Sequence, residues 1–299
     1  MPSLKEVKAR ITSIQSTQQI TKAMKMVAAA KLRKAQNRIE QIRPYSKKLT
    51  GLLDNITATL GEDDLPNTFG TVRAVKNVLV MVVTSDRGLC GGFNTNANKA
   101  AMAVISKKYN SQFEAGNVEV LPIGTKGRDF FKRREQYSVN STFATTFSNL
   151  VFEEAKKAAE YAMDGFLNGQ FDAVELVYNE FKNVATQVVK TQQFLPAVPA
   201  ETPENEEVTT TTVDYIFEPS KEEIVAELIP KALKIEFYKA LLESNASEQG
   251  ARMTAMDKAT ENAEDLLKEL KLTYNRTRQA YITTEILEIV GGAEALSAG

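Results

Sequence analysis

Hydrophobic residues recur every seven positions along the first fifth of the chain, which is typical of a coiled-coil helix. Counted in heptads from Leu4, twelve of the sixteen a and d positions are apolar. The a positions are Leu4, Ile11, Gln18, Lys25, Leu32, Ile39, Ser46 and Leu53, and the d positions are Val7, Ile14, Thr21, Ala28, Ala35, Ile42, Leu49 and Ile56. A strict repeat of this length predicts a left-handed supercoil. Pro44 interrupts it at an outward position, where it should bend the helix locally.

The C-terminal segment, from about Ser220 to Val290, has helical spacing and is the natural partner of the first helix. Its seam positions are Met253, Met256, Ala259, Ala263, Leu267, Leu270 and Tyr274. Ser220 followed by Glu223 resembles a capping box at its start. Pro230 is expected to kink its first turns, and the Gly291-Gly292 pair is expected to stop it.

Closing the chain predicts how the two helices pair. If both leave a central domain near residues 60 and 220, antiparallel neighbours should have residue numbers that sum to about 280, which places Leu4 opposite Arg276. The helix beyond that point would be unpaired, although it carries Tyr281, Ile282, Ile286, Leu287, Ile289 and Val290. A lone amphipathic helix of ~15 residues is marginal in water. We therefore expect another protein to form a sleeve around it.

The predicted seam has a polar middle at Gln18, Thr21 and Lys25. One interpretation is that these residues control the register of the two helices, as polar residues do in other coiled coils. The other is that this stretch, with Lys22 and Met24 beside it, pairs loosely and contacts a partner. The sequence leaves both interpretations open.

Between residues 76 and 217 the pattern changes to alternating strands and helices. Strands are expected at 78–83 and 118–123, helices at 97–109, 126–134 and 149–167, and a strand hairpin at 171–178 and 186–194. Such alternation indicates an α/β layer domain. The fold class is therefore α/β: a long antiparallel coiled coil of N- and C-terminal helices plus a central Rossmann-like α/β domain. The expected divisions are 1–60, 61–219 with a flexible loop at 196–212, and 220–299.

The Gly-rich turn at residues 84–94, between the first strand and the first helix of this domain, is the candidate for chemistry. Such turns can hold phosphate on backbone N–H groups. The stretch lacks both the G-x-G-x-x-G spacing and a Gly-Lys-Ser/Thr sequence. An ion pair between Asp86 and Arg87 that shapes the turn is the favoured interpretation. A nucleotide-binding enzyme remains an alternative.

Composition and charge narrow the function further. The 299 residues include no His and one Cys, which removes the commonest general base and argues against zinc sites, internal disulfides and thiol-ligated clusters. Residues 1–48 carry twelve Lys or Arg and two Glu, so the first helix is a basic rod of net charge +10. A nucleic-acid-binding arm is a second alternative, although no aromatic residues interleave with the lysines. We expect no catalytic residue, cofactor, metal or transmembrane segment.

Four motifs in this order resemble the gamma subunit family of F-type ATP synthases across nearly the whole chain. They are Ile20-Thr21-Lys22-Ala23-Met24-Lys25-Met26-Val27-Ala28, Ser85-Asp86-Arg87-Gly88-Leu89-Cys90-Gly91-Gly92, Ala246-Ser247-Glu248-Gln249, and Arg276-Thr277-Arg278-Gln279 continuing to Gly291-Gly292-Ala293. The resemblance implies a non-catalytic rotor. Its coiled coil would lie inside a ring of alpha and beta subunits, and its α/β domain would rest on the c ring beside epsilon, peripheral to the cytoplasmic face of a bacterial inner membrane.

The resemblance also implies which residues touch these partners. Arg278 and Gln279 match a pair that engages the catch loop of the beta subunit, with Thr283 and Glu285 near it. Met24 and Arg252 match a second contact region. Tyr215 and Glu218 match a segment that lies near the c ring.

Overall fold

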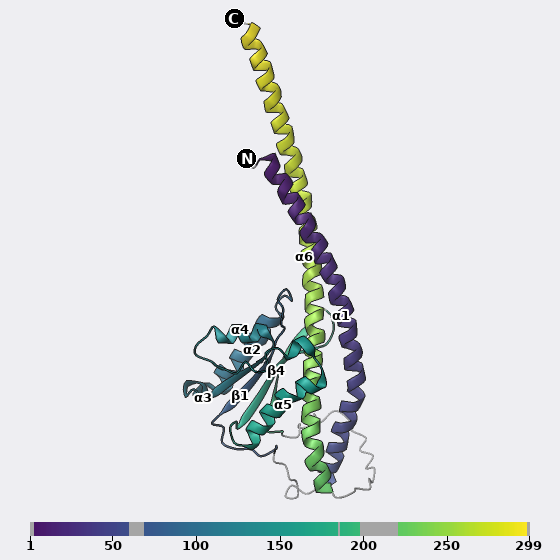
Figure 1. Ribbon diagram of the computed structural model, residues 1–299, viewed down its shortest axis with the longest axis vertical. Helices are drawn as coiled ribbons and strands as arrows, with labels where there is room; N and C mark the ends of the chain where they lie inside the picture. The colour runs from purple at the N-terminus through teal and green to yellow at the C-terminus, as the bar shows by residue number, and fades with distance from the viewer. Residues whose placement is uncertain (1–2, 60–68, 185, 198–220, 298–299) are drawn as a thin grey trace. The chain divides into compact units, whose positions relative to one another are not determined.

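The computed structural model describes residues 3–59, 69–184, 186–197 and 221–297. The chain forms two compact units: a sheet unit of residues 30–251, and a helical unit of residues 1–29 and 252–299. Helix α1 (Leu4–Thr59) and helix α6 (Lys221–Ser297) each contribute to both units. Figure 1 shows α1 and α6 as the two long helices and the sheet with its shorter helices.

The sheet unit is built on five strands in the order β3-β2-β1-β4-β5. The strands are β1 (Val78–Val83), β2 (Val118–Ile123), β3 (Ser138–Val139), β4 (Ala173–Phe181) and β5 (Gln187–Leu195). Parallel pairing joins β3, β2, β1 and β4, while β5 runs antiparallel to β4 at the edge. The predicted hairpin and the Rossmann-like parallel core are confirmed.

The connections are helices α2 (Phe93–Lys108), α3 (Asn110–Glu114), α4 (Thr125–Lys132) and α5 (Phe152–Leu167), with one 3-10 turn, η1 (Thr146–Asn149). Sequence patterns missed α3, β3 and η1, which are too short to show a period. They also placed the start of α2 at residue 97. It begins at Phe93, directly after the Gly-rich turn, because Asn residues in its first turns hide the apolar spacing.

Each face of the sheet has its own core. Every residue of β1 is fully buried, as expected for a strand covered on both faces. On one face Val80 and Val82 pack with Ala101 and Ile105 of α2 and Phe131 of α4. The odd-numbered residues of β1 face the opposite way, so the apolar run at 78–83 serves two cores at once.

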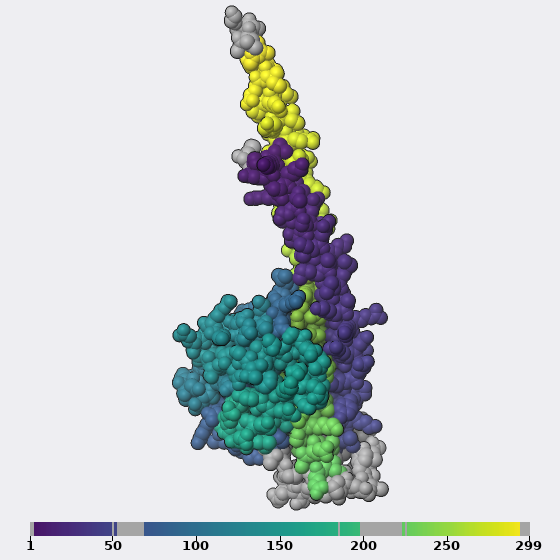
Figure 2. All heavy atoms as spheres, in the orientation of Figure 1, coloured from purple at the N-terminus to yellow at the C-terminus, as the bar shows by residue number. Residues whose placement is uncertain are grey.

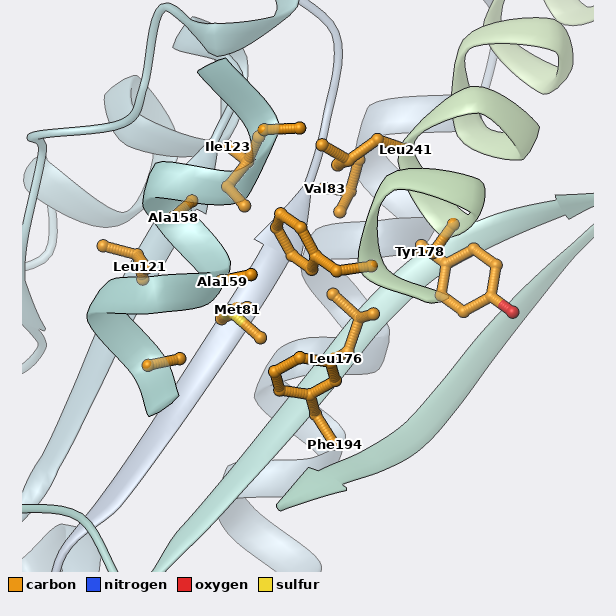
Figure 3. Close-up of a cluster of buried hydrophobic side chains, with 14 of the residues drawn as sticks. Met81, Val83, Leu121, Ile123, Ala158, Ala159, Leu176, Tyr178, Phe194 and Leu241 are labelled. Carbon is orange, nitrogen blue, oxygen red and sulfur yellow. The ribbon is translucent and has the colours of Figure 1, made fainter. Parts of the chain in front are cut away.

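The second core joins the sheet to parts of the two long helices. Figure 3 shows Met81, Leu121 and Leu176 from the strands beside Ala158 and Ala159 of α5. Leu241 of α6, at 0% exposure, belongs to the same cluster, as does the heptad residue Leu32 of α1. This part of α6 therefore serves as a structural element of the α/β layer.

One predicted boundary is wrong. The Gly291-Gly292 pair does not stop α6, which continues to Ser297. A glycine costs a helix only about 1 kcal/mol relative to Ala, and the following Ala293, Glu294 and Ala295 are strong helix formers. Pro44 and Pro230 both lie inside helices, and Pro44 points outward as predicted. The capping box expected at Ser220 lies outside the described residues.

A polar stripe of α6 is buried within the sheet unit. It comprises Glu243, Ser244, Ser247, Glu248 and Gln249, each less than 9% exposed. The Ser247 hydroxyl donates to the Asn179 carbonyl of β4 at 3.1 Å. The motif at residues 246–249 thus helps to fix α6 on the sheet, since buried polar groups need specific partners.

Glu243 makes this packing dependent on pH. Burial raises the pKa of its carboxyl above the ordinary value of 4.5, although Lys239 opposes the shift. A raised pKa means that the protonated form favours the folded state, so this contribution is full below the ordinary value and is lost as pH rises through the folded pKa. We expect Glu243→Gln to unfold at a higher temperature than the parent at pH 7, and the gap to close as pH falls below 4.5.

Thermal unfolding followed by circular dichroism between pH 4 and pH 8 would measure the effect. Glu261→Gln, at an exposed position of α6, is the control. An equal change in both variants, or a gap that widens in acid, would show that burial of Glu243 is not the cause.

Candidate functional site

The helical unit pairs residues 4–29 of α1 with α6 in an antiparallel seam. Lys25 Nζ lies 2.5 Å from Asp257 Oδ1, and Thr260 Oγ1 lies 2.8 Å from Thr21 Oγ1. The paired residue numbers sum to 282 and 281, against the expected value of about 280. The predicted antiparallel register is confirmed.

Burial follows the predicted heptads. The residues at a and d positions from Leu4 to Leu49 are all buried or half-buried, and most of the others are exposed. The side chains of Leu53 and Ile56 lie outside the described set. On α6 the predicted seam residues are buried or half-buried, including Met256, Ala263 and Leu267 at 5–7% exposure. The apolar seam of this unit therefore has the composition and period of a coiled coil.

The polar middle of the seam consists of matched pairs. Thr21 is 8% exposed, and its hydroxyl bonds both the Gln18 carbonyl, at 3.0 Å, and Thr260. The Lys25–Asp257 pair is about two-fifths exposed on each side, so it adds little stability. A one-turn slip would separate both pairs, which supports the register interpretation.

The start of α1 carries a capping box that the sequence analysis overlooked. The Ser3 N–H donates to Glu6 Oε2 at 3.0 Å, and the Glu6 N–H donates to Ser3 Oγ at 3.2 Å. Two donors at the helix N-terminus are thereby satisfied. The Ser-x-x-Glu signal was present at residues 3–6, in front of the first heptad.

No element in the described part of the chain covers the C-terminal part of α6. Among the side chains of α6 whose burial is described, Thr277 is the last half-buried one, and every residue from Arg278 to Ala293 is exposed. In Figure 2 this yellow end continues past the purple start of α1. Its exposed apolar side chains are Tyr281 (64%), Ile282 (45%), Ile286 (54%), Leu287 (66%), Ile289 (66%) and Val290 (48%). This segment, the free helix end, confirms the predicted overhang.

Four of the predicted contact residues lie on this free helix end. Arg278, Gln279, Thr283 and Glu285 are all exposed within about two helical turns, and Thr283 Oγ1 donates to the Gln279 carbonyl at 2.9 Å. They combine a guanidinium, an amide, a hydroxyl and a carboxylate on one short surface. Such a surface can form directional hydrogen bonds with a partner that surrounds the helix.

The other four predicted contact residues are placed differently. Met24 and Arg252 are half-buried residues of the helical unit. The observed register places Met24 opposite the neighbourhood of Asp257, more than one turn beyond Arg252. The two residues are therefore successive points along the seam and do not face each other. Tyr215 and Glu218 lie outside the described residues.

The Gly-rich turn after β1 is closed by its own hydrogen bonds. The first four N–H groups of α4 all donate within the chain: Thr125 to Asp86 Oδ1, Lys126 to the Ser85 carbonyl, Gly127 to Thr84 Oγ1, and Arg128 to the Gly124 carbonyl. These are the N-terminal donors of α4, the helix after β2, and each of them already has a partner within the chain, so none is left to hold a phosphate. Asp86 joins the Gly-rich turn to this helix by capping it.

The same turn is covered by α6. Cys90 and Phe93 form a small buried cluster with Ala251. In open α/β sheets, ligands bind outside the carboxyl ends of the strands where the strand order reverses, which here is between β1 and β4. The chain fills this place with its own side chains, so the geometry argues against the nucleotide-binding alternative.

Two buried titratable groups in the sheet unit, Glu175 and Tyr109, are hydrogen-bonded to each other. Glu175 of β4 accepts from Lys108 at 2.5 Å and from the Tyr109 hydroxyl at 2.7 Å. Burial, with the hydrogen bond to Glu175, raises the pKa of Tyr109 well above its ordinary value. Among the described residues, no group of three or more acidic or thiol side chains is placed to hold a metal ion. No helix in the described ranges is long and apolar enough to cross a membrane.

Comparisons with known proteins agree with this arrangement. A family model described as ATP synthase matches residues 3–296. The ATP synthase gamma chain of Cytophaga hutchinsonii is 60% identical over 99% of this chain and 100% of its own length, and that of Flavobacterium johnsoniae is 52% identical over the same shares. The chain belongs to the ATP synthase gamma chain family.

Solved structures of the ATP synthase family share the fold. A chain from the central stalk and c-ring of the Tetrahymena thermophila mitochondrial ATP synthase is 27% identical, with a TM-score of 0.55, over 80% of this chain and 99% of its own. A chain from the Euglena gracilis mitochondrial enzyme is 20% identical, with a TM-score of 0.66, over 99% and 95%. The family thus combines two long terminal helices with a parallel-rich sheet.

A substitution at Gly124 tests whether the close contact between the Gly-rich turn and the start of α4 matters for stability. Its φ is +121°, and an added Cβ would lie 2.1 Å from the Thr84 carbonyl oxygen. We expect Gly124→Ala to lower the free energy of unfolding by about 3 kcal/mol or more, from backbone strain plus the clash. Gly116→Ala, with φ +76° and no atom within 4 Å, is the matched control and should cost about 1 kcal/mol. Equal losses in urea unfolding would refute the role of the close contact.

Proposed function

We propose that this chain is the central shaft of an F-type ATP synthase, which transmits rotation driven by proton flow to ATP synthesis on the alpha and beta subunits. The observation that carries the proposal is the free helix end: residues 278–293 are exposed, rich in apolar side chains and continuous with a paired seam. A helix of this kind needs a surrounding bearing. Family membership supports a ring of alpha and beta subunits as that bearing.

The partners follow from the same argument. The solved relatives are described as parts of a central stalk with a c-ring and of an F1 and c-ring assembly. We infer that the sheet unit contacts the c ring and the epsilon subunit, with Tyr215 and Glu218 on the c-ring side. The chain would then lie peripherally at the cytoplasmic face of a bacterial inner membrane, held there by the complex. The division at residues 60 and 219 remains our proposal for its domains.

The shaft acts by presenting different side chains in turn to each beta subunit. Because α6 alone forms the free end and pairs with α1 further along, opposite sides of the shaft differ in charge and shape. Arg278 suits a releasable contact, since a guanidinium can donate two parallel hydrogen bonds to a carboxylate. Gln279, Thr283 and Glu285 would add polar contacts, and Met24 and Arg252 a second region. Catalysis itself belongs to the beta subunits.

Assembly provides the first test. Co-expressed with alpha and beta subunits, the chain should co-purify with them and change their rate of ATP hydrolysis. A chain that stays separate from them and leaves their activity unchanged would end the proposal.

The contact residues provide the second test. We expect Arg278→Ala with Gln279→Ala to lower coupled ATP synthesis about tenfold, because losing one charge-assisted hydrogen bond costs on the order of 1.4 kcal/mol. The circular dichroism spectrum should be unchanged, since both side chains are exposed. Lys258→Ala with Glu261→Ala, also exposed on α6, is the control. Unfolding of the Arg278 and Gln279 variant would show that these positions are structural.

A further inference from the structure

A groove runs between α1, α5 and α6 on the surface of the sheet unit. It consists of two hollows of about 730 Å³ and 460 Å³ that share Ile42, Tyr45, Phe152 and Tyr238. All residues that line it lie within the sheet unit. None of them belongs to the free helix end or to the Gly-rich turn, and none is among the contact residues named above.

The groove has an aromatic lining. Phe152 of α5 and Tyr238 of α6 meet edge to face, with ring centroids 5.5 Å apart and an interplanar angle of 80°. Tyr45 of α1 lies in both hollows and is 48% exposed. Aromatic side chains held in place by their neighbours are the usual anchors of protein interfaces, because they contribute large contact areas at little cost in conformational entropy.

Positively charged side chains from three helices surround this aromatic lining. They are Arg38 of α1, Lys156 of α5, and Lys231 and Lys234 of α6, against one acidic lining residue, Glu227. Glu153 and Glu160 pair with Lys156 and Lys234, each at 2.7 Å, so these two charges are partly compensated.

The adjoining part of α1 adds to the positive potential. Residues 30–48 contain seven Lys or Arg and one Glu, a net charge of +6. An apolar groove in such a field favours an occupant that is apolar on one side and negatively charged on the other.

We propose that this groove docks an acidic amphipathic segment of another protein chain. Apolar side chains of the segment would contact Tyr45, Phe152 and Tyr238, and its carboxylates would face Lys231 and Arg38, as when an amphipathic helix lies in an apolar groove. The inference rests on the proposed function in one respect: the segment belongs to another subunit of the same complex.

Site-specific photo-crosslinking in the assembled complex tests the proposal. Tyr45 is replaced by the photoreactive p-benzoylphenylalanine, the complex is purified and irradiated, and the crosslinked peptide is identified by mass spectrometry. A second variant carries the probe at Lys231, in case the first disturbs the groove. We expect a peptide from another subunit that carries several carboxylates. A crosslink to residues 198–220 of the same chain, to a lipid, or to a basic segment would overturn the proposal, as would a probe that reacts with nothing.

Charge reversal supplies the matched control. In the Tyr45 probe background, Lys231→Glu should lower the crosslink yield about three- to tenfold, because it removes one attraction and adds one repulsion. Lys107→Glu, an exposed reversal on α2 at the opposite face of the sheet, should leave the yield unchanged. Equal yields in both variants would overturn the role of charge. A complex that fails to assemble even without the probe contradicts the proposed function, whereas an assembled complex without the expected crosslink contradicts the groove alone.

Discussion

A helix remains folded in water only when part of its surface is covered, and α6 meets this requirement differently along its length. Between Leu233 and Ala251 it is covered by the sheet and α5, with Leu241 inside the main core. From Arg252 to Thr277 one face is covered by α1. From Arg278 nothing within the described chain covers it. The first two stretches stabilise the helix, and the third is available to other molecules.

The α/β layer resembles nucleotide-binding folds, but the chain's own side chains fill the place where a ligand usually binds. Asp86 and Thr84 satisfy amides of α4, while Cys90 and Phe93 pack against Ala251. In an enzyme of this fold, the carboxyl ends of the strands would remain open to a substrate or cofactor. Here the turn packs against a long helix and helps to position it.

Polar residues in the seam fix the register of α1 and α6 at some cost in the stability of their pairing. A fully apolar seam would bind more tightly, yet it would accept neighbouring registers. The Thr21–Thr260 contact and the Lys25–Asp257 pair add little energy and disfavour a shift. For a shaft, a fixed register matters because it sets which side chains of the free helix end face a given partner.

The sequence by itself determined the long-range plan. Seven-residue spacing located the seam, chain closure gave its register to within about two residues, and the apolar run at 78–83 identified the central strand. These features follow from the spacing of residues along the chain, so they can be recognised without knowing what packs against them. The same chain closure put Leu4 opposite Arg276, so it placed Arg278 and Gln279 just beyond the end of the seam.

Only the tertiary structure decided the features that depend on contacts between distant residues. The end of α6 at Ser297 could not be read from Gly291-Gly292, because a glycine pair stops a helix only when flanking propensity is weak. Asp86 becomes a cap of α4 through a residue 39 positions away. The aromatic groove unites side chains from three helices. Spacing along a chain reveals one face of one element, whereas a site made by several elements exists only once they have packed.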